Sequence, residues 1–295
     1  MYLIVRNFLP KAERIPVAGD DISRLRKDGI LIFDQIIDQN TVKKIREYLD
    51  SKPVYNWIEA DFNCKEKIPL KLSEIKITKQ TKLKYFDSDI AGCQEIVRLA
   101  NSDKIIPLVS EYLGCKPTIA TMSAWWTKAG SDPSGANLSS NDDISLATQR
   151  KIAAFGSNFD TDSKTNRYEK FYDDMFHRDV DDYKFIKLFI YLTDVEAENG
   201  AHCFIKTSHN SKKLTARRTL SDAEVAENFS AADKLVLTGK SGSGILEDTW
   251  GIHRALPCTK GERLLLHFLY SLTAFNADSS PPKPVAKNIY GVDSY

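Results

Sequence analysis

The sequence carries no excess of charge of either sign. Its 295 residues include 41 Lys and Arg against 40 Asp and Glu, which gives a formal net charge of +1. A dedicated nucleic-acid-binding protein carries a basic bias that shows in its overall charge. The balance therefore argues against nucleic acid as a partner, and only a local patch is expected to bind an anion.

Long apolar runs are also missing. A helix that spans a bilayer needs about 20 consecutive apolar residues, whereas the longest candidate, residues 185–192, is interrupted by Lys187. Residues 1–10 lack the apolar core and the small-residue cleavage site of a secretory signal. We therefore expect no membrane span and a cytoplasmic location.

Cysteine is scarce and scattered. The chain has five cysteines, an odd number, and no two of them form a CxxC pair. Disulfide frameworks and cysteine-rich zinc sites both need paired or closely spaced cysteines. Neither is expected in this chain.

The pattern of the first part of the chain is mainly helical. Residues 21–28 have the pattern of a short helix that ends at Gly29, a residue able to adopt the left-handed conformation. Asn40 is expected to cap a helix over residues 41–49, and a third helix is expected over residues 103–114. Further along, the sequence SDAE at 221–224 has the pattern of a capping box and predicts another short helix.

From about residue 118 the pattern changes to short apolar or alternating runs typical of β-strands. Strands are predicted over residues 118–127, 184–192, 201–206, 243–247 and 263–272. The segments between them are not regular amphipathic helices, which favours an antiparallel sandwich or barrel. The long polar segment 129–176 is interpreted as a lid or binding loop, because compact domains seldom keep such an excursion without a use.

Three residues have the types of a metal-binding triad. His177 and Asp179 form an HxD pair, whose side chains point to the same side of an extended segment, and His253 follows later in the chain. Two histidines and one carboxylate, with the other positions open, form the facial triad of non-haem Fe(II) oxygenases. The alternative for the HxD pair alone is a surface salt bridge.

Arg263 lies at the start of an apolar predicted strand. A buried guanidinium needs an anionic partner, because its desolvation is costly. The distal carboxylate of 2-oxoglutarate would accept its two-pronged hydrogen bonds. An internal salt bridge to an Asp or Glu is the alternative.

With these residues the chain resembles the phytanoyl-CoA dioxygenase family of Fe(II)- and 2-oxoglutarate-dependent oxygenases, which have a double-stranded β-helix (jelly-roll) core. The resemblance covers about residues 20–272. It rests on LRKDGILIF at 25–33, FHRD at 176–179, YLTDV at 191–195, NG at 199–200, TSH at 207–209, and then His253 and Arg263.

The resemblance implies an α+β fold and a single oxygenase domain over residues 1–295. Residues 1–117 would form a mainly helical support, and residues 118–275 would form the jelly-roll core with 129–176 as its lid. The chain departs from the family at Ala255, where a cosubstrate-binding serine is common, and at residues 206–207, where Pro-Gly is common.

The resemblance also implies roles for individual residues. His177, Asp179 and His253 would be the catalytic iron ligands, Arg263 the clamp on the cosubstrate, and Lys128 a second cosubstrate contact. Trp126 and Trp250 are candidate substrate contacts, with core packing as the alternative role. Trp126 lies on the predicted strand that precedes segment 129–176, and Trp250 lies three residues before His253.

The sequence thus predicts a hydroxylase for a C–H bond of a polar small molecule. Its cofactors and cosubstrates would be Fe(II), 2-oxoglutarate and O2, with ascorbate as a candidate reductant. Asp179 favours hydroxylation, because related halogenases have a small residue in place of the carboxylate. Two rivals remain open: a zinc-dependent hydrolase on the same three ligands, and a non-catalytic jelly-roll binding protein.

Overall fold

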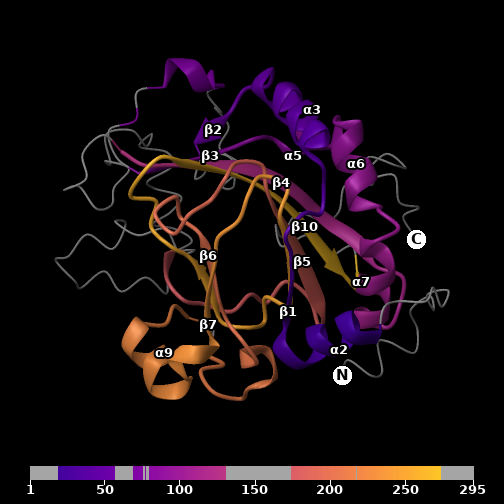
Figure 1. Cartoon of the computed structure of the whole chain (residues 1–295), viewed down its shortest axis with the longest axis vertical. Helices are drawn as coiled ribbons and strands as arrows, with labels where there is room; N and C mark the ends of the chain where they lie inside the picture. The colour runs from indigo at the N-terminus through magenta and orange to yellow at the C-terminus, as the bar shows by residue number, and fades with distance from the viewer. Residues whose placement is uncertain are drawn as a thin grey trace, which may run out of the picture.

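The computed structural model describes residues 19–56, 69–75, 77, 80–130, 174–216 and 218–273. Within these ranges, the amino-terminal helices form a layer along one side of a large sheet (Figure 1). They are α2 (Gly19–Asp28), α3 (Gln39–Asp50), α5 (Asp87–Ala91), α6 (Gln94–Ala100) and α7 (Ile105–Leu113). The remaining helices are α9 (Asp222–Asn228) and the short 3-10 turns η1 (Leu72–Glu74), η5 (Ser208–Asn210) and η6 (Ala231–Asp233).

The strands form two sheets with antiparallel pairing throughout. The order in the large sheet is β1 (Ile30–Phe33), β8 (Gly244–Glu247), β5 (Phe185–Tyr191), β10 (Glu262–Ser271), β4 (Thr118–Lys128), β3 (Thr81–Lys84) and β2 (Tyr55–Asn56). The order in the small sheet is β7 (Lys234–Leu237), β6 (His202–Ile205) and β9 (His253–Ala255). A bridge between His177 and His253 adds the HxD segment to the small sheet beside β9.

The path of the chain is that of a double-stranded β-helix. After β4 in the large sheet, the chain enters the small sheet at the HxD segment and returns to the large sheet as β5. It then forms β6 and β7 in the small sheet, β8 in the large sheet, β9 in the small sheet and β10 in the large sheet. The predicted α+β fold, a jelly-roll core with supporting amino-terminal helices, is confirmed.

Alternating residues of the large sheet face two different cores. On β4 and β10, Trp126 and Leu264 pack in the core beneath the helices, whereas Trp125 and Leu265 pack between the two sheets. This alternation follows from the two-residue period of a strand. It decides which side chains of a strand can reach the space inside the barrel.

The helix predictions hold, with corrections at the ends. Gly29 ends α2 in the left-handed conformation, with φ of 82°. The predicted cap of α3 is wrong: the helix includes Asn40, and the side chain of Asp38 accepts the capping bond from the amide of Thr41 at 2.8 Å. Asp and Asn are equally good caps, so the sequence alone did not discriminate between the two positions.

The capping box at the start of α9 is present as predicted. The side chain of Ser221 accepts a hydrogen bond from the amide of Glu224, whose carboxylate accepts one from the amide of Ser221. We expect Ser221→Ala to lower the unfolding free energy by about 1 kcal/mol, which thermal unfolding can measure as a small drop in Tm. Ser23→Ala, at an exposed hydroxyl in α2, is the control, and equal effects of the two changes would contradict the capping role.

The predicted lid over residues 129–176 falls mostly on residues 131–173, which lie outside the described residues. The division into one domain with a lid therefore stays a prediction. Among the described residues, no helix is both long enough and apolar enough to cross a membrane.

Candidate metal centre

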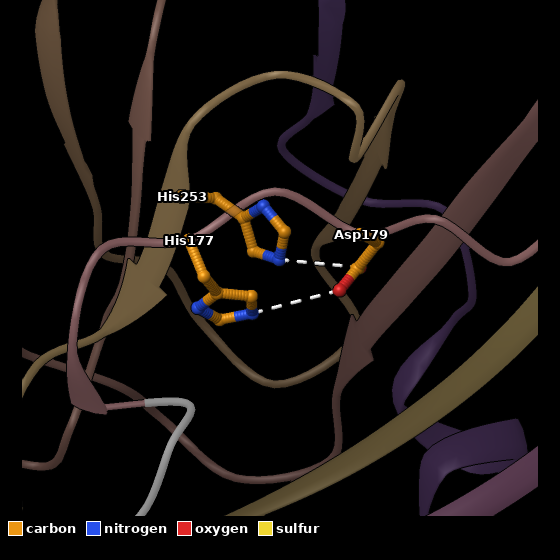
Figure 2. Close-up of side chains that lie close together, drawn as sticks. All are labelled: His177, Asp179 and His253. Carbon is orange, nitrogen blue, oxygen red and sulfur yellow. Dashed lines mark ion pairs between the residues drawn. The ribbon is translucent and has the colours of Figure 1, made fainter. Parts of the chain in front are cut away.

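The side chains of His177, Asp179 and His253 converge at the end of the small sheet (Figure 2). Two backbone hydrogen bonds pair His177 with His253, and the amide of Asp179 donates to the carbonyl of Thr249 at 2.9 Å. One ligand atom from each of the three side chains lies within 4.8 Å of the others. The sheet pairing therefore brings together the three residues that the sequence predicted as ligands.

The orientation of both rings is set by the backbone. Nδ1 of His177 lies 2.8 Å from the carbonyl oxygen of Met175, and Nδ1 of His253 lies 2.9 Å from that of Gly251. A ring that donates through Nδ1 presents the lone pair of Nε2. The two Nε2 atoms lie 3.6 Å and 3.3 Å from the carboxylate oxygens of Asp179, which is the arrangement that metal-ligating histidines need.

The charges around Asp179 keep the metal-free site ionised. Burial opposes the ionisation of Asp179, but the ammonium of Lys187 and the ring of His253 hold the pKa of its carboxyl well below its usual range. Burial alone would lower the pKa of His253, whereas the carboxylate of Asp179 raises it to about 9. A metal that bound here would therefore displace a proton from the site.

Arg178 is the middle residue of the HxD segment, and its side chain forms hydrogen bonds with two loops. Its buried guanidinium donates to the backbone carbonyls of Ser208, Lys213, Leu214 and Trp250. The guanidinium carbon also lies 5.3 Å from the centre of the ring of Trp250. These contacts give Trp250 a packing role, and its contact with substrate stays a prediction.

Arg263 is a buried cation that has no acidic partner among the residues that the structure describes. Only 2% of it is exposed, and it faces the inside of the barrel. It donates to the carbonyl of Gly200 and, at 3.4 Å, to the hydroxyl of Thr127. No described carboxylate forms an ion pair with it, and its Nε has no hydrogen-bond partner in the described part of the chain. The internal salt bridge that the sequence left open is therefore not found among the described residues.

The orientation of Lys128 and Trp126 does not support the roles predicted for them. Both lie at even positions of β4, which face the helices and not the space inside the barrel. Lys128 pairs with Glu262 and lies 4.6 Å above the ring of Trp126, whose Nε1 donates to the hydroxyl of Tyr85. Strand alternation thus turns both side chains away from the triad, and neither cosubstrate nor substrate contact is supported for them.

Three charged or polar residues inside the barrel were missed as site residues. Lys187 of β5 lies 2.7 Å from Asp179 and 2.8 Å from Asp181. Glu247 of β8 is fully buried and lies 2.7 Å from Nε2 of His202, whose ring stacks 5.6 Å from that of His253. The sequence contains a signal for two of them. Lys187 and Glu247 are charged residues in otherwise apolar strands, each two positions from a residue that faces the barrel interior.

Comparison with known proteins identifies solved structures that are similar to this one. No protein-family model matches the sequence, and no curated protein matches it. The epimerase SnoN of nogalamycin biosynthesis, determined with Fe3+, α-ketoglutarate and nogalamycin RO, is 14% identical, with 85% of this chain and 82% of SnoN covered and a TM-score of 0.51. HygX from Streptomyces hygroscopicus, determined with nickel, 2-oxoglutarate and hygromycin B, is 13% identical, with 86% and 87% covered and a TM-score of 0.49.

A third structure, the α-ketoglutarate-dependent carbocyclase SnoK of nogalamycin biosynthesis, is 10% identical, with 88% of this chain and 86% of SnoK covered and a TM-score of 0.48. At these identities the likeness to SnoN shows the fold alone. It agrees with the jelly-roll path that the strand pairing establishes.

Proposed function

We propose that this protein is an Fe(II)- and 2-oxoglutarate-dependent oxygenase that hydroxylates a polar small molecule. The observation that carries the proposal is the convergence of His177, Asp179 and His253, with both imidazoles oriented by backbone carbonyls. Two imidazoles and one carboxylate suit Fe(II) and leave coordination positions open. The order of HxD, distal histidine and arginine favours the phytanoyl-CoA dioxygenase family among enzymes of this fold.

The inside of the barrel also fits the cosubstrate. Arg263 is a buried fork of donors that contacts only neutral groups among the described residues. A carboxylate is the ligand that such a fork binds best. SnoN, which shares the fold, was determined with Fe3+ and α-ketoglutarate, and this supports the same pair here.

Each part of the site would have a separate task. Iron and 2-oxoglutarate would supply the oxidising chemistry, in which O2 is consumed and the cosubstrate is decarboxylated to succinate. His177, Asp179 and His253 would hold the metal, and Arg263 would fix the far end of the cosubstrate. The apolar side chains between the sheets, which include Trp125, Phe189 and Leu265, would exclude water from the reacting groups.

The rival functions explain less of the structure. A zinc-dependent hydrolase would use the same triad but would leave the buried guanidinium of Arg263 facing neutral groups. A non-catalytic binding protein would need no open metal site. Neither is favoured by a specific contact of the described residues.

The decisive experiment is anaerobic loading with Fe(II) followed by 2-oxoglutarate. Chelation of the keto acid by Fe(II) produces a visible charge-transfer absorption band, which neither Zn(II) nor a metal-free protein gives. Admission of O2 should then release succinate. A protein that binds Zn(II) tightly and shows no such band with Fe(II) would be a hydrolase candidate, and the oxygenase proposal would be abandoned.

Arg263→Gln should weaken 2-oxoglutarate binding by about tenfold, or about 1.4 kcal/mol, because it removes the charge but keeps a hydrogen-bond donor. Titration of the charge-transfer band measures this affinity, and Fe(II) affinity should stay close to the wild-type value. Arg254→Gln is the matched control, since Arg254 pairs with Asp222 on the outer side of β9. An unchanged cosubstrate affinity in Arg263→Gln would assign the carboxylate clamp to another residue.

A further inference from the structure

A buried lysine is in direct contact with the carboxylate of the triad. Nζ of Lys187 lies 2.7 Å from Oδ2 of Asp179 and 2.8 Å from Oδ2 of Asp181, with only 13% of its side chain exposed. The ammonium thus supplies, in the metal-free protein, the positive charge that a metal would supply to Asp179. Two cations cannot share this carboxylate without strong repulsion, because the site is buried and poorly screened.

A second buried carboxylate lies next to the same lysine and is only half satisfied. Glu247 is the register partner of Lys187 across β5 and β8, and both side chains face the barrel interior. Directly opposed residues of antiparallel strands have Cβ atoms about 5 Å apart. Oε1 of Glu247 pairs with His202, whereas Oε2 is buried and has no hydrogen-bond partner among the described residues.

We propose that Lys187 is a displaceable counter-ion of the metal site, which pairs with Asp179 in the metal-free protein and moves toward Glu247 when the metal binds. The proposal rests on the proposed metal site but assigns Lys187 and Glu247 a role of their own. Both are positioning residues: Lys187 keeps Asp179 in place until the metal arrives, and Glu247 stabilises the ammonium afterwards. Glu247 is suited to this role because, among the described residues, only one of its carboxylate oxygens has a hydrogen-bond partner. The other oxygen can accept a hydrogen bond from the ammonium.

The mechanism predicts opposite effects of two substitutions on metal affinity. Lys187→Met removes the ammonium that competes with the metal for the carboxylate of Asp179. Asp179 and Asp181 then lack a cation in the metal-free protein, so the metal should bind about tenfold more tightly. Glu247→Gln removes the negative charge that receives the displaced ammonium, so the metal should bind about tenfold more weakly. A merely structural role would weaken binding in both variants.

The test is anaerobic calorimetric titration of the full chain with Fe(II) and, separately, with Co(II), whose visible spectrum reports the ligand set. Thermal unfolding with and without metal gives a second readout: Lys187→Met should lower the Tm of the metal-free protein and increase the gain in Tm on metal binding. Lys240→Met and Glu196→Gln, at exposed positions of the surface, are matched controls that should leave both quantities unchanged.

The outcomes separate this proposal from the proposed function. If wild-type protein binds neither Fe(II) nor Co(II) through the triad, the metal site itself is wrong. If wild-type protein binds the metal but Lys187→Met binds it equally or more weakly, the counter-ion role is overturned while the metal site stands. Unchanged affinity in Glu247→Gln would likewise overturn the transfer of the ammonium to Glu247.

Discussion

Replacing Asp179 with alanine is expected to weaken Fe(II) binding by more than about a hundredfold. The change would remove one of the three proposed metal ligands, and even residues that only orient a ligand typically contribute 10- to 100-fold to metal affinity. It also leaves Lys187 near two imidazoles with only Asp181 of its two carboxylate partners. Anaerobic calorimetry with Fe(II) measures the loss, and the Co(II) spectrum shows whether the remaining two ligands still bind.

Asp194→Ala is the matched control for this change. Asp194 is an exposed aspartate that pairs with Lys240 on the surface, so its removal should leave metal affinity unaltered. His177→Ala and His253→Ala should resemble Asp179→Ala in the size of the loss. Retention of near wild-type affinity in any of the three variants would mean that the side chain is not a ligand.

Lys82→Met is expected to lower the unfolding free energy by about 3 to 5 kcal/mol, because it leaves a buried carboxylate without its cation. Nζ of Lys82 lies 3.0 Å from Oδ1 of Asp174, and the two side chains are 1% and 3% exposed. Gln80 donates to the other oxygen of Asp174 at 3.1 Å. Urea unfolding of the metal-free protein measures the loss.

The double change Lys82→Met with Asp174→Leu should recover most of that stability, since an apolar pair of similar volume no longer carries an unpaired charge. Lys71→Met, at an exposed lysine that pairs with Glu74, is the control and should cost less than about 1 kcal/mol. A comparably small cost in Lys82→Met would show that water reaches the buried pair.

The fold and the triad could be predicted because both leave local signals in the sequence. The strands of the core have apolar runs of the right length, and Gly29 and Gly114 mark helix ends by adopting positive φ. The HxD pair is contiguous, so a strand period of two suffices to place His177 and Asp179 on one side. His253 is indicated by its residue type and supported by the family resemblance, and the sheet pairing brings it to the other two.

The rest depended on tertiary contacts that no local pattern encodes. Nothing in the sequence distinguishes Lys82 from the exposed Lys71, yet its position opposite Thr127 places it inside the protein beside Asp174. Lys128 was a candidate because it matches a position of the family that the chain resembles. Only the register of β4 against β10 shows that it points toward the helices.

The central strand of the large sheet, β10, is expected to pair late in folding. It pairs with both β4 and β5, and Arg263 contacts Thr127 although 136 residues separate them in the chain. Contacts of such long range are slow to form, because the entropy of closing the loop is lost before the pairing compensates for it. His177 and His253 are also far apart in the chain and pair only across the small sheet. We therefore expect them to meet late in folding, so that a metal would bind a chain whose sheets have already closed and would not template their closure.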